Sequence, residues 1–460
     1  MSRANAFVVL LIALGGACAG AAVAASSQVL LAAMGVAVIA GFTVAGYRSS
    51  RRRSGALFPM AFVGAGAAVL ALGAVANWAT AGSGRTTWGV WLAVGGGFSA
   101  FAAGSTVALV AMAQTRGAVG SWRSSTDETV SRRQRTVLRR ADGVLLAISF
   151  LNLITGEIIA LSANVTSSRF SGDYGVAGRA WPVVLGALEA SFALHAVLLA
   201  RRRRFEDLIF CVMISLVFVA TASRSFALIA FAAIAIVYLE RRRPPLWLVT
   251  VALATGITVA GSIGYLRVSS EFGAATVNQS LVDRELPTGP VGQTLSNLAT
   301  GPWVLSTTLH DVPERVPFQH GVFFLRDGLN LLDSSVVRSD RWVTESILER
   351  DTSTNGGMPP TLVGGLYLDF GYAGIGVGLF AVGFATVVLY PVASRRGLPG
   401  RLQYCLWCAY LLTSLYSYLS LKPAFIASVL LLEVLIRLDR RDPGSVVSPH
   451  PELRVVSEAA

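Results

Sequence analysis

Charged side chains are scarce in this sequence. Asp, Glu, Lys and Arg make up 14% of its 460 residues, whereas 53% of the residues are hydrophobic. Soluble domains carry about a quarter charged residues, so this composition excludes an ordinary soluble protein. Apolar runs of roughly 20 residues, the length that crosses the hydrocarbon core of a membrane, recur along the whole chain. The sequence therefore predicts a membrane protein built from helices.

Cysteine and histidine are also few, with four of each. All four cysteines fall in apolar runs, and Cys405 and Cys408 have the C-x-x-C spacing of redox and metal pairs. No second pair or histidine is near them in the sequence, so we interpret them as small apolar side chains. Neither a Walker motif nor an HExxH motif occurs, so ATP hydrolysis and metalloprotease chemistry have no support, and we expect no cofactor and no metal.

Lysine is nearly absent, and arginine carries the formal net charge of +12. Most arginines fall in six segments that we expect to be cytoplasmic: 48–53, 116–140, 201–204, 241–243, 395–401 and the tail from 437. Short cytoplasmic loops of membrane proteins are enriched in arginine. This pattern therefore predicts a protein of the cytoplasmic membrane with both termini in the cytoplasm. The runs carry no nucleic-acid recognition motif, so anionic membrane lipids are the expected partners and nucleic acid is not.

Twelve helical spans account for the apolar runs. They are predicted at 5–25, 28–47, 57–80, 88–113, 142–163, 181–200, 207–222, 225–240, 245–265, 360–391, 402–419 and 423–438. The glycine-rich stretch 94–104 suits close helix packing in lipid. Residues 114–141 show no apolar periodicity and are expected to form an arginine-rich cytoplasmic loop, and the tail 441–460 is expected to be disordered.

One long segment, 266–358, separates two spans and is expected to lie outside the cytoplasm. Its apolar patches 291–309, 322–332 and 342–348 predict short amphipathic helices at the membrane surface. Loops of this length in a compact protein are usually functional. The predicted fold is thus an all-α polytopic bundle with nine spans in 1–265, the external loop 266–358, and the last spans in 359–440.

Two tight hairpins direct a single cation each toward the outer face. Arg224 lies between the spans 207–222 and 225–240, and Lys422, the only lysine of the chain, lies between the last two spans. Because arginine-rich segments flank both hairpins, these turns must face outward. Either cation could instead be anchoring the end of its helix at the membrane interface.

The segment TNGGMPPTLVGGLYLDFGYAGIGVGLFAVGF, residues 354–384, resembles the signature of bacterial oligosaccharide repeat-unit polymerases, the Wzy-type O-antigen polymerases. The matching residues are Gly364, Tyr367, Asp369, Phe370, Gly371 and Gly374. The turn TASRSFALIAF around Arg224 and the segment PFQHGVFFLRDGLNLL, residues 317–332, also resemble parts of that family. The resemblance covers 205–390 and implies a GT-C-like membrane fold.

The resemblance implies a metal-independent, inverting glycosyltransferase that polymerises polyprenyl-diphosphate-linked oligosaccharide repeats on the outer face of the cytoplasmic membrane, in surface polysaccharide biosynthesis. A flippase and a chain-length regulator would be its partners. The leaving diphosphate needs charge neutralisation, and arginine supplies a permanent charge with a planar fork that matches phosphate oxygens. The candidates for this role are Arg224, Arg267, Arg326 and Lys422.

Attack by the acceptor hydroxyl also calls for a general base. The candidates are His320, His310, Asp369 and Glu345, with Tyr367 as a further residue of the signature. We favour His320, which lies in a family-like segment, and Asp369, because an ionisable residue inside an apolar span is costly. Asp369 could equally form a buried pair with an arginine. Arg338, Arg341 and Arg350 have carboxylates within a turn and are expected to be solvated ion pairs.

Three other functions stay open at this point. An O-antigen ligase would share the fold and donor but use another acceptor. A transporter or flippase of lipid-linked sugars would suit twelve spans, although transporters usually have paired repeats. A structural partner in an assembly complex predicts that Arg224→Ala leaves polymer formation intact.

Overall fold

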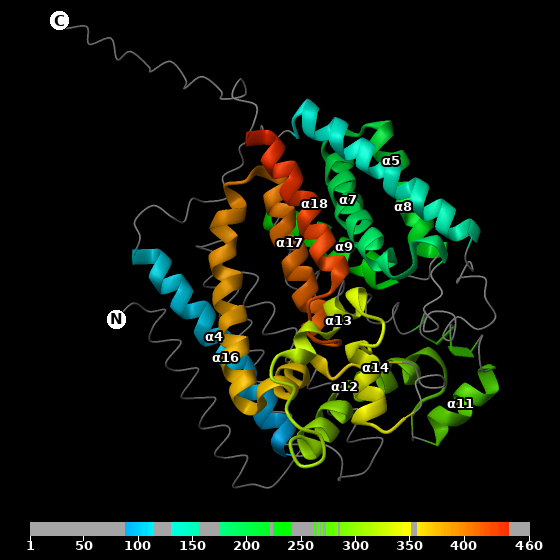
Figure 1. Ribbon diagram of the computed structural model, residues 1–460, viewed down its shortest axis with the longest axis vertical. Helices are drawn as coiled ribbons and strands as arrows, with labels where there is room; N and C mark the ends of the chain where they lie inside the picture. Colours follow the sequence, from blue (N-terminus) through cyan, green and yellow to red (C-terminus); the bar gives the residue numbers. More distant parts are fainter. Residues whose placement is uncertain are drawn as a thin grey trace, which may run out of the picture.

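The computed structural model describes residues 88–114, 130–155, 175–220, 224–241, 273–283, 286–350 and 357–440, and a few single positions between 262 and 269. All regular structure in these ranges is helical, and they contain no strand (Figure 1). The predicted spans 5–25, 28–47 and 57–80, most of 245–265, and the tail 441–460 lie outside the described residues.

Three described helices are long and apolar enough to cross a membrane, as the composition predicted. They lie at Leu92–Met112, Ala177–Arg202 and Thr361–Ala393, and each overlaps a predicted span. Large apolar side chains are exposed on the outside of the bundle, among them Val377, 71% exposed, and Leu430, 58% exposed. Such surface is unfavourable in water and typical of helices that face lipid. The other spans of the predicted twelve stay predictions.

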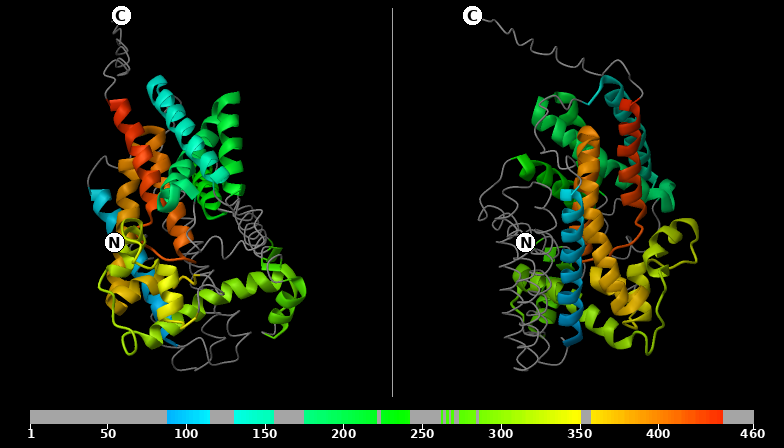
Figure 2. Two further views of the ribbon diagram at one scale, coloured as in Figure 1. Left: turned by 45° about the vertical axis from the view of Figure 1, so that its right-hand side comes forward. Right: turned by 90° about the vertical axis from the view of Figure 1, so that its left-hand side faces the viewer.

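The most extensive helix contact joins α4 (Trp88–Gln114) and α16 (Thr361–Ser394), which lie side by side (Figure 2). Glycine allows their backbones to touch, because a Cβ added at Gly104 or at Gly383 would collide with a carbonyl oxygen of the facing helix. The Ser105 hydroxyl donates to the Gly383 carbonyl at 3.2 Å. The close packing predicted for 94–104 is therefore confirmed at Gly97 and Gly104, whereas Gly95 and Gly96 face open space.

Six of the described helices form a second group around a common apolar core. They are α5 (Arg132–Thr155), α7 (Trp181–Arg202), α8 (Phe205–Ala220), α9 (Arg224–Arg241), α17 (Gly397–Ser414) and α18 (Pro423–Arg440), with the short 3-10 helix η3 (Gly175–Ala180) before α7. Most of α7 is buried, and the Ser428 hydroxyl of α18 donates to the Gly186 carbonyl at 2.6 Å. Trp407 packs against this core and against the core around α16, so it links the two groups.

Helix α5 begins earlier than the sequence indicated. Its buried residues include Gln134, Leu138, Asp142 and Leu146, which are spaced by four and share one face. Two of these four are polar, so apolar periodicity alone did not reveal the helix. The Gln134 N–H donates to the Ser131 hydroxyl at 3.2 Å, and the Ser131 N–H donates to Gln134 Oε1 at 2.8 Å, which is a capping box. The prediction of a loop over 114–141 is therefore wrong for 132–141.

The described helices of the segment 266–358 gather at one end of the bundle (Figure 1), and the prediction that all of them are short is wrong for one helix of 23 residues. They are α11 (Ala274–Val282), α12 (Gly289–Asp311), α13 (Val322–Leu332) and α14 (Ser339–Ser346). The predicted patches 291–309 and 322–332 are fully helical, and 342–348 is helical up to Ser346. Phe323, Val343 and Ile347 are buried in the same core as α4 and α16. These helices therefore pack against the bundle, and their side of the membrane stays a prediction.

Candidate active site

The site is centred on α13 and on a kink in α16. The kink lies at Phe370 and Gly371, and Gly371 has φ 63°, in the left-handed region that favours glycine. The kink frees the carbonyls of the preceding helical turn. Two of them accept hydrogen bonds from the segment that leads into α13, from Gln319 N–H to Leu368 at 2.8 Å and from His320 N–H to Asp369 at 3.0 Å. The kink thus docks residues 317–321 onto α16.

The Asp369 carboxylate caps α13. Asp369 Oδ1 accepts the backbone N–H of Gly321 at 2.9 Å and of Phe323 at 3.0 Å, and Asp369 Oδ2 accepts that of Phe324 at 3.1 Å. These are N–H groups at the start of a helix, which have no partner within the helix. The buried Asp369 is thus held by backbone donors, and it forms no ion pair with an arginine of the described residues.

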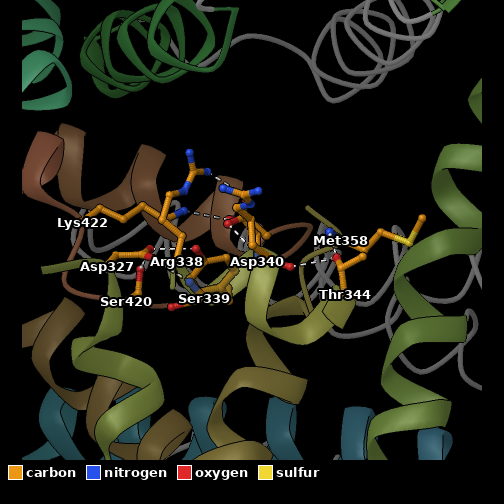
Figure 3. Close-up of polar contacts among 11 residues, drawn as sticks. Asp327, Arg338, Ser339, Asp340, Thr344, Met358, Ser420 and Lys422 are labelled. Carbon is orange, nitrogen blue, oxygen red and sulfur yellow. Dashed lines mark hydrogen bonds and ion pairs between the residues drawn. The ribbon is translucent and has the colours of Figure 1, made fainter. Parts of the chain in front are cut away.

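A second carboxylate, Asp327, joins α13 to the 415–422 connection between α17 and α18. It accepts hydrogen bonds from the Tyr418 hydroxyl at 2.7 Å, the Ser420 hydroxyl at 2.7 Å and the Ser339 N–H at 3.1 Å. Burial alone would raise the pKa of Asp327, but the nearby Lys422 ammonium and these donors outweigh it and lower that pKa below its usual value. Asp327 is therefore a fixed negative charge at the centre of the cluster (Figure 3).

Lys422 is engaged within the protein. Its Nζ donates to the Ser417 hydroxyl at 3.2 Å and lies 4.7 Å from the centroid of the Tyr418 ring. The next residue toward the N-terminus, Leu421, donates its N–H to the Phe324 carbonyl at 2.9 Å. Burial lowers the pKa of Lys422, and Asp327 opposes that shift. Asp327 thus offsets part of the cost of burying the Lys422 ammonium, and the hydrogen bond from Leu421 to Phe324 holds the 415–422 connection against α13.

Arg326 has more unused donor capacity than Lys422. Its Cζ lies 4.8 Å from the centroid of the Trp342 ring, and its Nη2 donates to Gln319 Oε1 at 3.3 Å. Its Nε is buried and has no hydrogen-bond partner in the described part of the chain. Burial lowers the pKa of Arg326, although Asp327 and Asp369 oppose the shift. A guanidinium has five N–H donors. Arg326, held against the Trp342 ring, could therefore donate to a ligand with several oxygen atoms.

Helix α14 brings further charges to the same place. Arg338 Nη2 lies 2.7 Å from Asp340 Oδ2, next to Lys422 and Asp327 (Figure 3). The ion pair expected for Arg338 is therefore present, but it is partly buried and not fully solvated. The Thr344 hydroxyl accepts the Met358 N–H at 2.7 Å, which fixes the chain just before α16. The cluster therefore consists of alternating charges from α13, α14 and the 415–422 connection.

The other predicted residues are not all brought together. His320 is exposed beside Phe370, with a ring separation of 6.4 Å and φ 50°. Tyr367 is buried, and its hydroxyl donates to the Val312 carbonyl at 2.9 Å. His310, at the end of α12, and Glu345, on α14, are exposed. Arg224 begins α9, but its side chain lies outside the described part, and so does Arg267 altogether.

Several members of the cluster were not predicted from sequence. The contacts of Asp327 with Tyr418 and Ser420 depend on the packing of α13 against the 415–422 connection. They could not be predicted, because 91 residues separate Asp327 from Tyr418 and 93 separate it from Ser420. The one signal in the sequence was the charged pair Arg326 and Asp327 in a mainly apolar helix. Among the described residues, no group of three His, Cys, Asp or Glu side chains is placed to hold a metal ion.

The chain was compared with family models, with curated proteins and with solved structures. None of the three comparisons found a match.

Proposed function

We propose that this chain is a membrane glycosyltransferase that polymerises polyprenyl-diphosphate-linked oligosaccharide repeats at the outer face of the cytoplasmic membrane. The resemblance of residues 354–384 and 317–332 to repeat-unit polymerases supports the reaction class. The observation that carries the proposal is the setting of Arg326, a guanidinium with unused donors, held on α13 by Trp342 and Gln319. These two resembling segments are the ones that Asp369 joins.

In this reaction the bond between the donor's anomeric carbon and its diphosphate oxygen breaks. A new bond forms from that carbon to the acceptor hydroxyl oxygen, the hydroxyl proton leaves, and polyprenyl diphosphate is released. Arg326 would neutralise the departing diphosphate. His320, exposed beside the kink, would take the proton. Asp369 and Lys422 would act as positioning residues, and Arg224 and Arg267 stay candidates for further contacts to the diphosphate.

Reconstitution tests the proposal directly. The purified chain is placed in liposomes with lipid-linked repeat units, and polymer length is read on a gel. We expect Arg326→Gln to slow polymerisation by about 10²–10³-fold, the usual loss when a donor to transition-state charge is removed, and Arg326→Lys to restore part of the rate. Arg350→Gln, an exposed arginine that stacks on Trp303, is the matched control and should polymerise normally. A wild-type rate of polymerisation in Arg326→Gln would show that Arg326 does not bind the leaving diphosphate.

The role of His320 is tested in the same assay. A general base contributes about 10²–10⁴-fold, so His320→Gln should lose that much rate while keeping the affinity for the lipid-linked donor. The variant should fold normally because the His320 side chain is exposed and only its backbone N–H binds Asp369. A small loss of rate would assign the base elsewhere.

One observation favours the transporter alternative. His195 lies between two carboxylates, with its ring nitrogens 2.8 Å from Asp142 Oδ2 and 2.8 Å from Asp207 Oδ1, and all three side chains are buried among α5, α7 and α8. Ionisable groups buried in membrane helices are often parts of proton pathways. A transporter would move lipid-linked sugar across sealed vesicles without a change in chain length, and His195→Asn would stop that movement. A polymerase builds polymer without any gradient.

The ligase alternative differs only in the acceptor. An assay that supplies both a lipid-linked repeat unit and a lipid-anchored core acceptor distinguishes a polymerase from a ligase. A polymerase extends the chain on the carrier, and a ligase transfers it to the core.

A further inference from the structure

A basic cavity lies at the other end of the molecule from α13. It has a volume of about 590 Å³, and five arginines line it: Arg132, Arg135, Arg139, Arg202 and Arg204. Three of them come from the first two turns of α5, and two come from the end of α7 and the connection to α8. The α7 end is fixed by Arg203, whose backbone is left-handed with φ 48° and whose N–H donates to the Leu199 carbonyl at 2.8 Å. The arginines are thus held on ordered backbone.

The position of the cavity follows from α18. At one end of this helix, Leu421 in the preceding connection binds Phe324 of α13. Near the other end, the Leu435 carbonyl accepts a hydrogen bond from Gln134 Nε2 at 2.8 Å, in the first turn of α5. An α-helix rises about 1.5 Å per residue, so the contacts at Leu421 and Leu435 lie roughly 20 Å apart along this helix. The cavity is therefore independent of the site around Arg326.

Arg135 is the least satisfied of the five arginines. Its Nε and Nη2 are buried and have no hydrogen-bond partner in the described part of the chain. Burial lowers the pKa of Arg135, and the neighbouring charges of Arg202 and Arg204 lower it further. Buried polar groups are normally hydrogen-bonded, and a buried group without a partner calls for an explanation such as a bound ion or ligand.

The nearby carboxylates of the described residues do not balance this charge. Glu206 forms an ion pair with Arg139, and Asp207 attracts Arg135 but also binds His195 at 2.8 Å. Among the described residues, two carboxylates therefore face five guanidinium groups, and one of the two is shared with a histidine. Part of the excess complements the negative end of the α7 dipole, but Arg132 and Arg135 lie at the positive start of α5. That end of a helix attracts anions.

We propose that this cavity binds a phosphate-bearing anion, with Arg135 donating to its oxygens and Arg132, Arg139, Arg202 and Arg204 surrounding it. The volume exceeds that of a single inorganic phosphate and suits a diphosphate or the headgroup of an acidic phospholipid. The segments 116–140 and 201–204 are the ones expected to face the cytoplasm, so the ligand comes from the cytosol or from the inner leaflet. This site does not depend on the reaction proposed for α13.

Inorganic pyrophosphate is the first probe, added to the full chain purified in an uncharged detergent. Binding should raise the melting temperature of the wild-type protein in a concentration-dependent way. Arg135→Gln and Arg204→Gln should each weaken the binding about tenfold or more, since each removes a charge-assisted donor. Arg133→Gln is the matched control, because Arg133 is an exposed neighbour of Arg132 that does not line the cavity. It should bind as the wild type does.

A second arm separates the two sources of the anion. The protein is mixed with phosphatidylglycerol and phosphatidylcholine, and the lipids that stay bound are identified by native mass spectrometry. Preferential retention of phosphatidylglycerol that Arg135→Gln abolishes and Arg133→Gln preserves assigns a lipid headgroup. Binding of pyrophosphate with equal lipid retention in both variants assigns a soluble anion. Either outcome supports the site.

The proposal is overturned if neither probe distinguishes Arg135→Gln from Arg133→Gln. The melting temperature without ligand tests whether Arg135→Gln loses binding because it misfolds. Removing Arg135 relieves the repulsion from Arg202 and Arg204, so the melting temperature of Arg135→Gln without ligand should equal or exceed that of the wild type. A large loss of stability in that variant, with unchanged stability in Arg204→Gln and no binding difference, would also count against a ligand site.

Discussion

Asp369 illustrates how a carboxylate inside an apolar helix can be accommodated without an ion pair. A carboxylate inside an apolar span predicts function or an ion pair, because an unpaired charge there is costly. The structure shows a third solution, in which three backbone N–H groups of another helix start meet both carboxylate oxygens. That solution could not be predicted from the sequence, since nothing in residues 354–384 indicates that 321–324 lies against them.

Substitution of Asp369 separates a cap from a catalytic base. Asp369→Asn keeps Oδ1, which receives two of the three hydrogen bonds, so it should lower the free energy of unfolding by about 1 kcal/mol and preserve most activity. Asp369→Ala leaves all three N–H groups without a partner and should cost about 3 kcal/mol. Denaturation followed by circular dichroism measures both. Loss of polymerisation by more than about 100-fold in a stably folded Asp369→Asn would show that the carboxylate takes part in the chemistry.

The Asp327 carboxylate predicts a dependence of stability on pH. Its pKa in the folded protein lies below the usual value of about 3.9. The stabilisation is therefore fully present above that value and is lost as the pH falls through the lower, folded pKa. Asp327→Asn should reduce the free energy of unfolding by about 1–3 kcal/mol at pH 7, and the difference from wild type should shrink below about pH 4. Melting curves from pH 3 to 8 measure this.

A double substitution is the control for that result. If the charge of Lys422 is balanced mainly by Asp327, Lys422→Met added to Asp327→Asn should cost less than the sum of the two single changes. Strictly additive losses would mean that the two charges do not interact.

At the scale of the helix, the kink in α16 depends on one glycine. Gly371 has φ 63°, and a Cβ added there would lie 3.0 Å from the Phe318 ring. Gly371→Ala should therefore cost about 1–2 kcal/mol for the left-handed backbone, with a further loss from the contact. Gly376 lies in the same helix with open space around its Cβ position, so Gly376→Ala should be neutral or stabilising by up to about 1 kcal/mol. Equal effects on the melting temperature would contradict the kink.

Helix positions were predicted well where the sequence is continuously apolar. The three helices long and apolar enough to cross a membrane and the helix of residues 322–332 follow directly from apolar runs of the sequence. The start of α5 was missed, since its buried face includes Gln134 and Asp142. The kink was also missed, because Gly371 is one of several glycines in its segment and only the contact with 317–321 distinguishes it. Local sequence does not carry such pairings.

For the whole molecule, arginine placement predicts which end faces the cytoplasm. The α13 end is expected outside and the cavity around Arg135 inside. A cysteine introduced by Glu314→Cys, in the exposed connection before α13, should react with a membrane-impermeant maleimide in intact cells. One introduced by Arg133→Cys should react only after permeabilisation. Labelling is measured by mass shift.

The cysteine background permits this measurement. Cys211, Cys405 and Cys408 are buried, so they should react slowly, and Cys18→Ser removes the fourth. Reaction of Arg133→Cys in intact cells would reverse the predicted orientation and would place the Arg135 cavity outside.

The contact between residues 319–324 and the kink has a mechanical consequence. Opening this segment as a flap would break the hydrogen bonds of Gln319 and His320 as well as the three at the Asp369 carboxylate, at a cost of several kcal/mol. Residues 319–324 and the first turns of α16 should therefore move together as one rigid unit. In the reaction proposed above, the lipid-linked substrate would therefore bind without movement of residues 319–324 relative to α16.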